Sequence, residues 1–251
     1  MKMYTIKRKR FLKNIILESI LPPYEVDEAY EEELIGEFQN GVERTYFDHF
    51  IKLVGLNGFI LDLACGDGRH TLRLSEKMRY VTALDLSSKQ LYKARIKCQL
   101  KENISFIRGS MFNLPFREKI FDGIWLSQAF EYVPPDMRDR FIEYIIGILK
   151  SGGILFMSVE TWLYPSFLKS IKNFMKDFML YLYWKFLKRK PLLWGEYLYK
   201  LTVNDGYTIY HYHVHTDKRT LLKPVKKHKL KILDLDLHDG YIYILYRKYY
   251  T

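Results

Sequence analysis

Short apolar runs alternate with amphipathic stretches through the middle of the chain. Five runs have the length and continuous hydrophobicity of buried strands, at 59–63, 81–84, 104–107, 120–126 and 154–159. Apolar residues at helical spacing predict helices between them, at 69–78, 88–100 and 136–149. Strands that are apolar on both faces and alternate with helices are typical of a parallel sheet covered on both sides. The pattern therefore predicts an α/β fold for the centre of the chain.

Helical patterns come before this alternation. The first 20 residues have the spacing of an amphipathic helix, and 24–55 predicts two helices, the second at 42–54.

After Glu160 the alternation ends, and apolar residues at helical spacing predict a long helix at 165–190. Its apolar residues share one side, and they are Leu168, Ile171, Met175, Phe178, Leu182 and Phe186. The lysines at 169, 172 and 176 face away from that side. We expect a loop-rich section to His215, a short helix near 217–223, and strands at 230–237 and 241–247 joined by a tight turn.

Together these patterns predict one seven-stranded, mostly parallel sheet that ends in an antiparallel hairpin. We expect a single domain, 1–251, whose parts are an N-terminal helical arm at 1–55, a core at 56–160, a helical cap inserted after the fifth strand at 161–228, and a closing hairpin at 229–251.

Composition excludes several classes of protein. Hydrophobic residues are 48% of the chain, which is too many for a disordered polypeptide. Two cysteines do not build a disulfide scaffold and favour a reducing compartment, and no apolar run is long enough to span a membrane. The basic start lacks the uninterrupted apolar stretch of a signal peptide, so we expect a cytoplasmic protein.

The net charge of +11 is unevenly distributed. The first 20 residues and the part after 160 are strongly basic, whereas 21–160 is slightly acidic. A basic surface suits nucleic acid, an anionic membrane surface or an acidic substrate, and the sequence leaves all three open.

A glycine-rich turn follows the first predicted strand and leads into the next helix. Ala64, Gly66 and Gly68 stand in this turn, and glycine lets the backbone bend sharply and approach a ligand closely. Amides at the start of the following helix face the same ligand. Asp85 ends the second strand, where a carboxylate accepts both hydroxyls of a ribose. This order of elements predicts a site for an adenosine-containing ligand.

The spacing within the turn separates two ligand classes. A dinucleotide site has the pattern G-x-G-x-x-G, whereas this chain has Ala64-x-Gly66-x-Gly68. Asp62 precedes the turn, and its carboxylate repels a phosphate but suits a ligand that carries ammonium and sulfonium groups. The turn therefore favours S-adenosylmethionine over NAD.

From these motifs, the sequence over 42–160 resembles the class I S-adenosylmethionine-dependent methyltransferases, which have a Rossmann-like fold. Residues 60–68 match their first motif with Ala64 in place of the usual first glycine, and 106–111 resembles the adenine-binding segment. Residues 121–127 and 149–153 resemble the fourth strand and the turn before the fifth. The resemblance implies S-adenosylmethionine as the cofactor, bound by Asp62, Ala64, Gly66, Gly68, Asp85, Leu86, Ser110, Met111 and Ser127.

The resemblance also implies in-line displacement of the methyl group from sulfonium onto a nucleophile. Alignment and exclusion of water supply most of such catalysis, and a general base is needed only for a protonated acceptor. No Asn/Asp-Pro-Pro-Tyr motif follows the fourth strand, which argues against methylation of base amino groups and leaves O-methylation favoured.

Two residues are predicted to act on the acceptor. Glu131 follows the fourth strand near the expected acceptor position, where a helix N-terminal acid is the alternative interpretation. His213 stands between His211 and His215, and an extended backbone puts all three on one face. They line an acceptor pocket, lie on an exposed strand face, or bind a metal, and we predict no metal because no carboxylate or cysteine is clustered near them in the sequence.

The acceptor is a small molecule, or tRNA bound through the basic flanks. The histidine segment resembles the methyltransferases that esterify carboxymethyl-uridine at the tRNA wobble position. The helix at 165–190 is a lid over the acceptor site, an interfacial helix in peripheral contact with a membrane, or an RNA-binding surface, with the lid favoured. The alternative to an enzyme is a catalytically silent protein of the same fold that binds RNA or a partner through its basic flanks.

Overall fold

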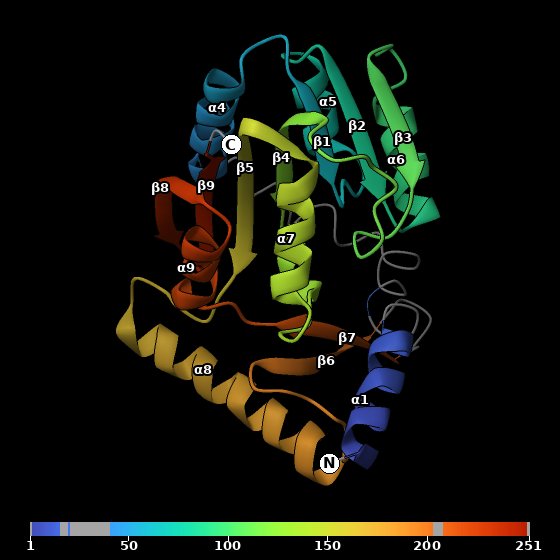
Figure 1. Cartoon of the computed structure of the whole chain (residues 1–251). Coiled ribbons are helices and arrows are strands. Elements are labelled where there is room, and N and C mark those ends of the chain that lie inside the picture. The colour runs from blue at the N-terminus through green and yellow to red at the C-terminus, as the bar shows by residue number, and fades with distance from the viewer. Residues whose placement is uncertain (1, 16–19, 21–40, 203–207, 250–251) are drawn as a thin grey trace.

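Seven strands form the main sheet of the computed structural model, which describes residues 2–15, 20, 41–202 and 208–249 (Figure 1). They are β1 (Phe59–Leu63), β2 (Tyr80–Asp85), β3 (Ile104–Arg108), β4 (Phe121–Ser127), β5 (Leu149–Glu160), β8 (Leu230–His238) and β9 (Tyr241–Lys248). Their spatial order is β3-β2-β1-β4-β5-β9-β8. The first five are parallel, and β9 is antiparallel to both neighbours. The predicted mostly parallel seven-stranded sheet with an antiparallel hairpin is confirmed.

Two layers of helices cover this sheet. One layer holds α4 (Val42–Val54), α5 (Arg69–Ser75) and α6 (Ser88–Lys97), and the other holds α7 (Arg138–Ile148) and α9 (Lys218–Lys227). Aromatic residues of α4 pack edge-on against Trp125, which stacks on Phe156 at 3.7 Å between ring centroids. The apolar residues at helical spacing in 42–54 therefore hold α4 on the sheet through their packing.

The N-terminal segment begins with α1 (Lys2–Ile15), in agreement with the predicted amphipathic helix. The other helix predicted within 24–55 lies outside the described residues. Arg8 fixes α1 to the rest of the molecule, since it is 5% exposed and pairs with the carboxylates of Glu196 and Asp136 at 2.6 Å each. This double ion pair joins the start of the chain to the inserted segment.

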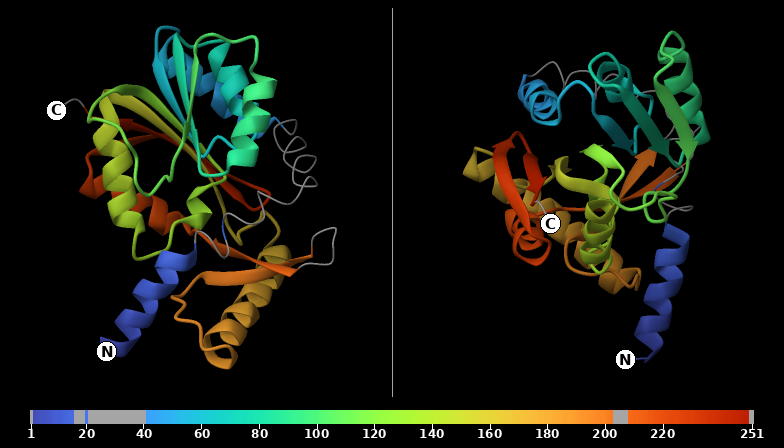
Figure 2. Two further views of the ribbon diagram at one scale, coloured as in Figure 1. Left: turned by 90° about the vertical axis from the view of Figure 1, so that its right-hand side faces the viewer. Right: turned by 45° about the horizontal axis from the view of Figure 1, so that its top comes forward.

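The segment after β5 combines a helix with a strand pair. The helix α8 (Phe167–Leu182) continues into a π-helical turn, Tyr183–Leu187. The strands β6 (Glu196–Thr202) and β7 (Thr208–Val214) form a separate antiparallel ribbon. Figure 2 shows α1, α8 and the ribbon together at one end of the molecule.

The ribbon corrects the sequence-based prediction of a loop-rich section up to His215. Tyrosine, histidine and charged residues interrupt the apolar residues of both strands, so no continuous apolar run marks them in the sequence. Their burial comes from packing: Tyr212 is fully buried and Trp184 donates a hydrogen bond to the Leu198 carbonyl at 2.6 Å. Contacts with segments that are distant in the sequence therefore determine that these residues form a ribbon. The inserted cap is accordingly a helix with a strand ribbon, where a helical cap was expected.

Within the described residues, no helix has the length and apolar character needed to cross a membrane.

Candidate functional site

The glycine turn after β1 has a left-handed backbone at three positions, because φ is +59° at Ala64, +55° at Gly66 and +81° at Gly68. The two glycines differ in what surrounds them. A Cβ built on Gly68 would lie 2.8 Å from the Cβ of Ala94, so α6 packs directly against the turn. A Cβ built on Gly66 would meet no protein atom within 4 Å. Gly68 therefore serves helix packing, whereas a side chain at Gly66 would enter open space.

Asp85, at the end of β2, connects the second strand to this turn. Its carboxylate accepts hydrogen bonds from the amide of Gly66 at 2.9 Å and from the amide of Ser87 at 2.8 Å. Leu86, beside it, is half-buried and accepts a hydrogen bond from Arg108 at its carbonyl. The structure thus brings Asp85 and Gly66 together, as a shared ligand requires.

Asp62 lies in β1, just before the turn, and its side chain is buried, with 2% of the residue exposed. Its carboxylate accepts a hydrogen bond from the hydroxyl of Thr71 at 2.6 Å. Burial raises the pKa of Asp62 to about 6, although the nearby His70 and the Thr71 hydrogen bond act in the opposite direction. A cationic ligand bound next to this group would favour its ionised form.

The predicted adenine-binding segment follows β3 and lies next to Asp85. The amide of Gly109 donates a hydrogen bond to the Asp85 carbonyl at 2.9 Å. The hydroxyl of Ser110 accepts a hydrogen bond from the amide of Phe112, and Met111 is buried in the main core. Ser110 therefore shapes its own turn, and its contact with adenine stays a prediction.

Ser127, at the end of β4, lies in a buried polar cluster that the sequence analysis missed. Its hydroxyl donates to the carboxylate of Glu43 on α4 at 2.5 Å and lies 3.0 Å from the hydroxyl of Ser158. Glu43 is 2% exposed and lies within 3.7 Å of Arg69 and 3.4 Å of His70. No local signal marked Glu43, which is one of two acids in the amphipathic helix 42–54.

The cluster stabilises the negative charge of the Glu43 carboxylate. Burial opposes ionisation of its carboxylate, but His70, Arg69 and the Ser127 hydroxyl together lower its pKa to about 2. An ionised Glu43 orients Arg69, at the start of α5, and Ser127 around the glycine turn. The role of Ser127 in cofactor binding remains a prediction.

His213 of the ribbon meets Glu160 at the carboxyl end of β5. The Nδ1 atom of His213 lies 2.7 Å from Oε2 of Glu160. Burial raises the pKa of Glu160, but the interaction with His213 outweighs it and holds that pKa below its ordinary value. On the other side of the ring, Nε2 of His213 lies 3.5 Å from the hydroxyl of Tyr199. The pair is therefore an imidazole oriented by an ionised carboxylate.

The neighbouring histidines extend this group into a cluster. The hydroxyl of Tyr199 lies 2.6 Å from Nδ1 of His211, and burial together with His213 lowers the pKa of His211 well below its ordinary value. His215 pairs with Asp177 of α8 at 2.5 Å. His211 is fully buried, which excludes an exposed strand face. Among the described residues, no group of three or more His, Cys, Asp or Glu is arranged to hold a metal ion.

Glu131 lies in the 3-10 turn Phe130–Tyr132 after β4 and is 3% exposed. The ring of its neighbour Tyr132 stacks on His211 at 5.3 Å and meets His213 edge-on at 5.1 Å, both between ring centroids. The structure therefore places the two predicted catalytic residues on adjacent elements.

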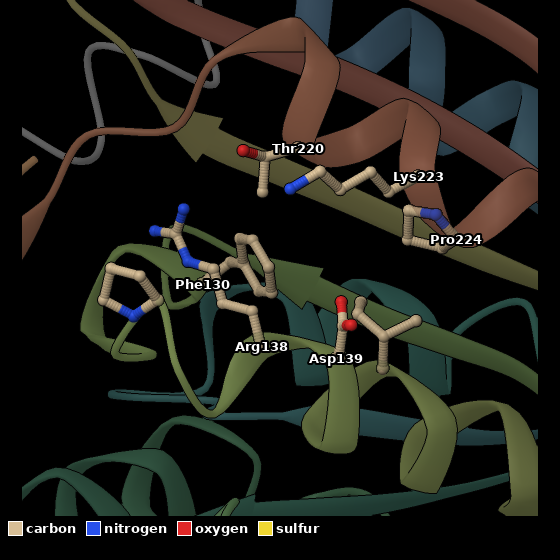
Figure 3. Close-up of a pocket in the computed structure, with 8 residues that line it drawn as sticks. Phe130, Arg138, Asp139, Thr220, Lys223 and Pro224 are labelled. Carbon is tan, nitrogen blue, oxygen red and sulfur yellow. The ribbon is translucent and has the colours of Figure 1, made fainter. Parts of the chain in front are cut away.

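A small hollow of about 100 Å³ lies elsewhere, between α7 and α9 (Figure 3). Arg138 and Asp139 reach it from α7, and Thr220 and Lys223 reach it from α9. No predicted cofactor or catalytic residue lines it.

The sheet order and the glycine turn define a class I methyltransferase fold. Residues 60–153 match the family model described as a methyltransferase domain. Residues 60–153 are therefore a class I, S-adenosylmethionine-dependent methyltransferase domain, which confirms the family resemblance found in the sequence.

Similar proteins share this domain. The demethylmenaquinone methyltransferase of Lactococcus lactis is 36% identical over 106 residues, which are 40% of each chain. A ubiquinone/menaquinone biosynthesis C-methyltransferase, UbiE of Wigglesworthia glossinidia brevipalpis, is 28% identical over 208 residues, 78% of each chain. The chain thus spans two fifths of the first relative's length and more than three quarters of the second's.

The solved structure of a DhpI–SAM–HEP complex superposes with a TM-score of 0.65 at 19% identity, over 87% of this chain and 91% of that one. At this identity the likeness is one of fold.

Proposed function

We propose that this chain transfers a methyl group from S-adenosylmethionine to an acceptor that carries an ionisable hydroxyl group. The observation that carries this proposal is the pair formed by His213 and Glu160 at the carboxyl end of β5. An ionised Glu160 holds the Nδ1 hydrogen of His213, so Nε2 is left as a proton acceptor. The Oε2–Nδ1 distance of 2.7 Å fits that assignment.

The residues around the glycine turn fit the cofactor. The open position beside Gly66 lets a ligand approach the backbone, Asp85 offers a carboxylate for the ribose hydroxyls, and the carboxylate of Asp62 suits the cationic part of the molecule. S-adenosylmethionine supplies a methyl group that its positive sulfur already activates for transfer.

His213 then acts on the acceptor. Its Nε2 takes the proton of the acceptor hydroxyl, and the deprotonated oxygen would be the nucleophile for the methyl group that bound S-adenosylmethionine would supply. The proton leaves His213 for solvent after the transfer. Glu160 keeps the imidazole oriented, and the buried ribbon excludes water from the reaction.

The walls of this site favour an aromatic acceptor. Rings of Tyr132, Tyr197 and Tyr199 surround the imidazole of His213 at 5 to 6 Å between centroids. A deprotonated phenol is nucleophilic at oxygen and at the adjacent ring carbon. O-methylation is the outcome that we favour, and methylation at the ring carbon of such a phenolate would be a C-methylation, the type of reaction named for the UbiE relative.

Two alternatives receive less support. His211 is fully buried and His213 is 8% exposed, so the histidine strand offers little surface to an RNA backbone, which favours a small acceptor. The family match and the contact of Asp85 with Gly66 favour an enzyme over a catalytically silent binding protein.

The test is methyl transfer from S-adenosylmethionine labelled with carbon-13 in its methyl group to a panel of phenols, naphthols and hydroquinones. Carbon NMR of the product separates a methoxy group from a ring methyl. We expect His213→Gln to lower kcat about a hundredfold or more with little change in KM for S-adenosylmethionine. His238→Gln, at the half-exposed end of β8, is the matched control and should keep full activity. Full activity in His213→Gln, or no transfer to any of these acceptors, contradicts the proposal.

A further inference from the structure

The outer side of α8 and the turn after it carries an exposed apolar ridge. The residues of this outer ridge are each at least 40% exposed, and they are Leu168, Ile171, Met175, Met179, Tyr183 and Phe186. Their spacing of three to four residues puts them on one side of the helix. Single exposed apolar residues are common, but a continuous row of six marks an interaction surface.

The outer ridge is not needed to hold α8 on the molecule. A different side of the helix packs inward, where Phe174 meets Trp162 at 5.2 Å and Phe178 meets Trp194 at 5.8 Å between ring centroids. Asp177 lies on this inner side and pairs with His215. The sequence predicted that Leu168, Phe178 and Phe186 share one apolar side of this helix. In the structure Leu168 and Phe186 are exposed, whereas Phe178 is half-buried.

The charges beside the outer ridge are almost all positive. Residues 165–190 contain seven Lys or Arg and one acid, and that acid is Asp177 on the inner side. Lys172 and Lys176 are exposed. Lys172 is four residues after Leu168 and three before Met175, and Lys176 is three before Met179, so both border the ridge. The expectation that these two lysines face away from the apolar side was therefore wrong.

Further basic residues lie at the same end of the molecule. The segment 188–190, Lys-Arg-Lys, is exposed where the helical part ends. Figures 1 and 2 show that α1 projects from this end as well, and it exposes Lys7, Lys9, Arg10 and Lys13.

We propose that the outer ridge docks on the surface of an anionic lipid bilayer. The apolar side chains would enter the boundary between head groups and acyl chains, and the bordering lysines would meet lipid phosphates. Long lysine side chains suit this position because their stems lie along apolar surface while the ammonium stays in water.

The charge pattern favours a bilayer over a second copy of the chain. Two outer ridges facing each other would bring Lys172 and Lys176 toward like charges, with no acid on this side of α8 to neutralise them. An anionic bilayer offers both an apolar layer and negative charge.

The proposal is tested by sedimentation with vesicles, without cofactor or acceptor, so its outcome is independent of the proposed methyl transfer. The chain should bind vesicles of phosphatidylglycerol mixed with phosphatidylcholine and bind pure phosphatidylcholine at least about tenfold more weakly. The triple variant Met175→Ser, Met179→Ser, Phe186→Ser should weaken binding to the mixed vesicles about tenfold or more. Lys172→Glu with Lys176→Glu should weaken it to a similar extent.

A matched control lies at the opposite part of the molecule. Leu100 is 89% exposed beyond the end of α6, and Leu100→Ser should bind vesicles as the unchanged chain does. Circular dichroism and melting temperature confirm that each variant folds, which is expected because all the changed side chains are exposed.

Three results would overturn the proposal. The first is no binding of the unchanged chain to the mixed vesicles, and the second is equal binding by the triple variant. The third is a dimer in analytical ultracentrifugation that the triple variant converts to a monomer while no vesicle binding is seen, which assigns the outer ridge to a second copy of the chain.

Discussion

The amide of Gly66 donates a hydrogen bond to the carboxylate of Asp85 at 2.9 Å, which joins the turn after β1 to the end of β2. The other carboxylate oxygen accepts from the amide of Ser87 at 2.8 Å. Two backbone amides therefore hold the carboxylate in place at the mouth of the predicted cofactor site.

Asp85→Asn should abolish the rise in melting temperature that S-adenosylhomocysteine produces in the unchanged chain. The amide side chain lacks the charge that strengthens hydrogen bonds from ribose hydroxyls, each of which contributes about 1.5–3 kcal/mol when its acceptor is charged. Thermal unfolding with and without the nucleoside measures the effect. Asp122→Asn is the control, because Asp122 forms a surface ion pair with Lys150 at the start of β4. An undiminished shift in Asp85→Asn would show that Asp85 does not hold the ribose.

Alanine at the two glycines of the turn should separate binding from folding. Gly68→Ala forces a Cβ against Ala94 at a left-handed backbone position, so we expect the free energy of unfolding to fall by about 2 kcal/mol or more. Gly66→Ala carries the backbone strain alone, about 1–2 kcal/mol, but places its Cβ in the space predicted for the ligand. Urea unfolding measures stability, and calorimetric titration with S-adenosylhomocysteine should find binding lost in Gly66→Ala. Unchanged affinity in that variant would exclude Gly66 from the site.

Glu43 should make the stability of the fold depend on acid. Its pKa falls from 4.5 to about 2 on folding, so the folded state binds fewer protons and gains about 3 kcal/mol of stability above the unfolded pKa. That gain is present above about pH 4.5 and is lost as the pH falls toward about 2. Urea unfolding at about pH 6 and about pH 3 measures it. Glu43→Gln should flatten this dependence, whereas Glu76→Gln, at a half-exposed surface carboxylate, should retain it. The same acid slope in Glu43→Gln would contradict the assignment.

Arg8 should be essential for attaching α1 to the ribbon. Arg8→Met leaves the buried carboxylate of Glu196 without its guanidinium, which typically costs about 3–5 kcal/mol of unfolding free energy. Arg8→Met combined with Glu196→Gln should recover part of that loss, because no buried charge is then left unpaired. Arg10→Met, on an exposed position of the same helix, should change stability by less than about 0.5 kcal/mol. Equal effects of Arg8→Met and Arg10→Met in urea unfolding would rule out the predicted role.

The sequence-based predictions were accurate for elements formed by local interactions and failed for the element that depends on contacts between distant segments. The strand at 59–63 has the predicted bounds, and the turn at Asp239 and Gly240 joins β8 to β9 as expected, because apolar runs and turn residues act locally. The ribbon of β6 and β7 was missed, since its strands depend on contacts with Trp184 and Glu160 that no local period reveals.

The sequence by itself determined the alternating sheet, the glycine turn with Asp85 and the family, because hydrophobic period, glycine position and motif spacing are properties of neighbouring residues. Only the tertiary structure decided which side chains meet. It placed Glu43 against Ser127 across 84 residues and Glu160 against His213 across 53, and it turned the outer ridge of α8 toward solvent. Such pairs are set by how elements pack in three dimensions, where burial and complementary charge act between segments that the sequence keeps far apart.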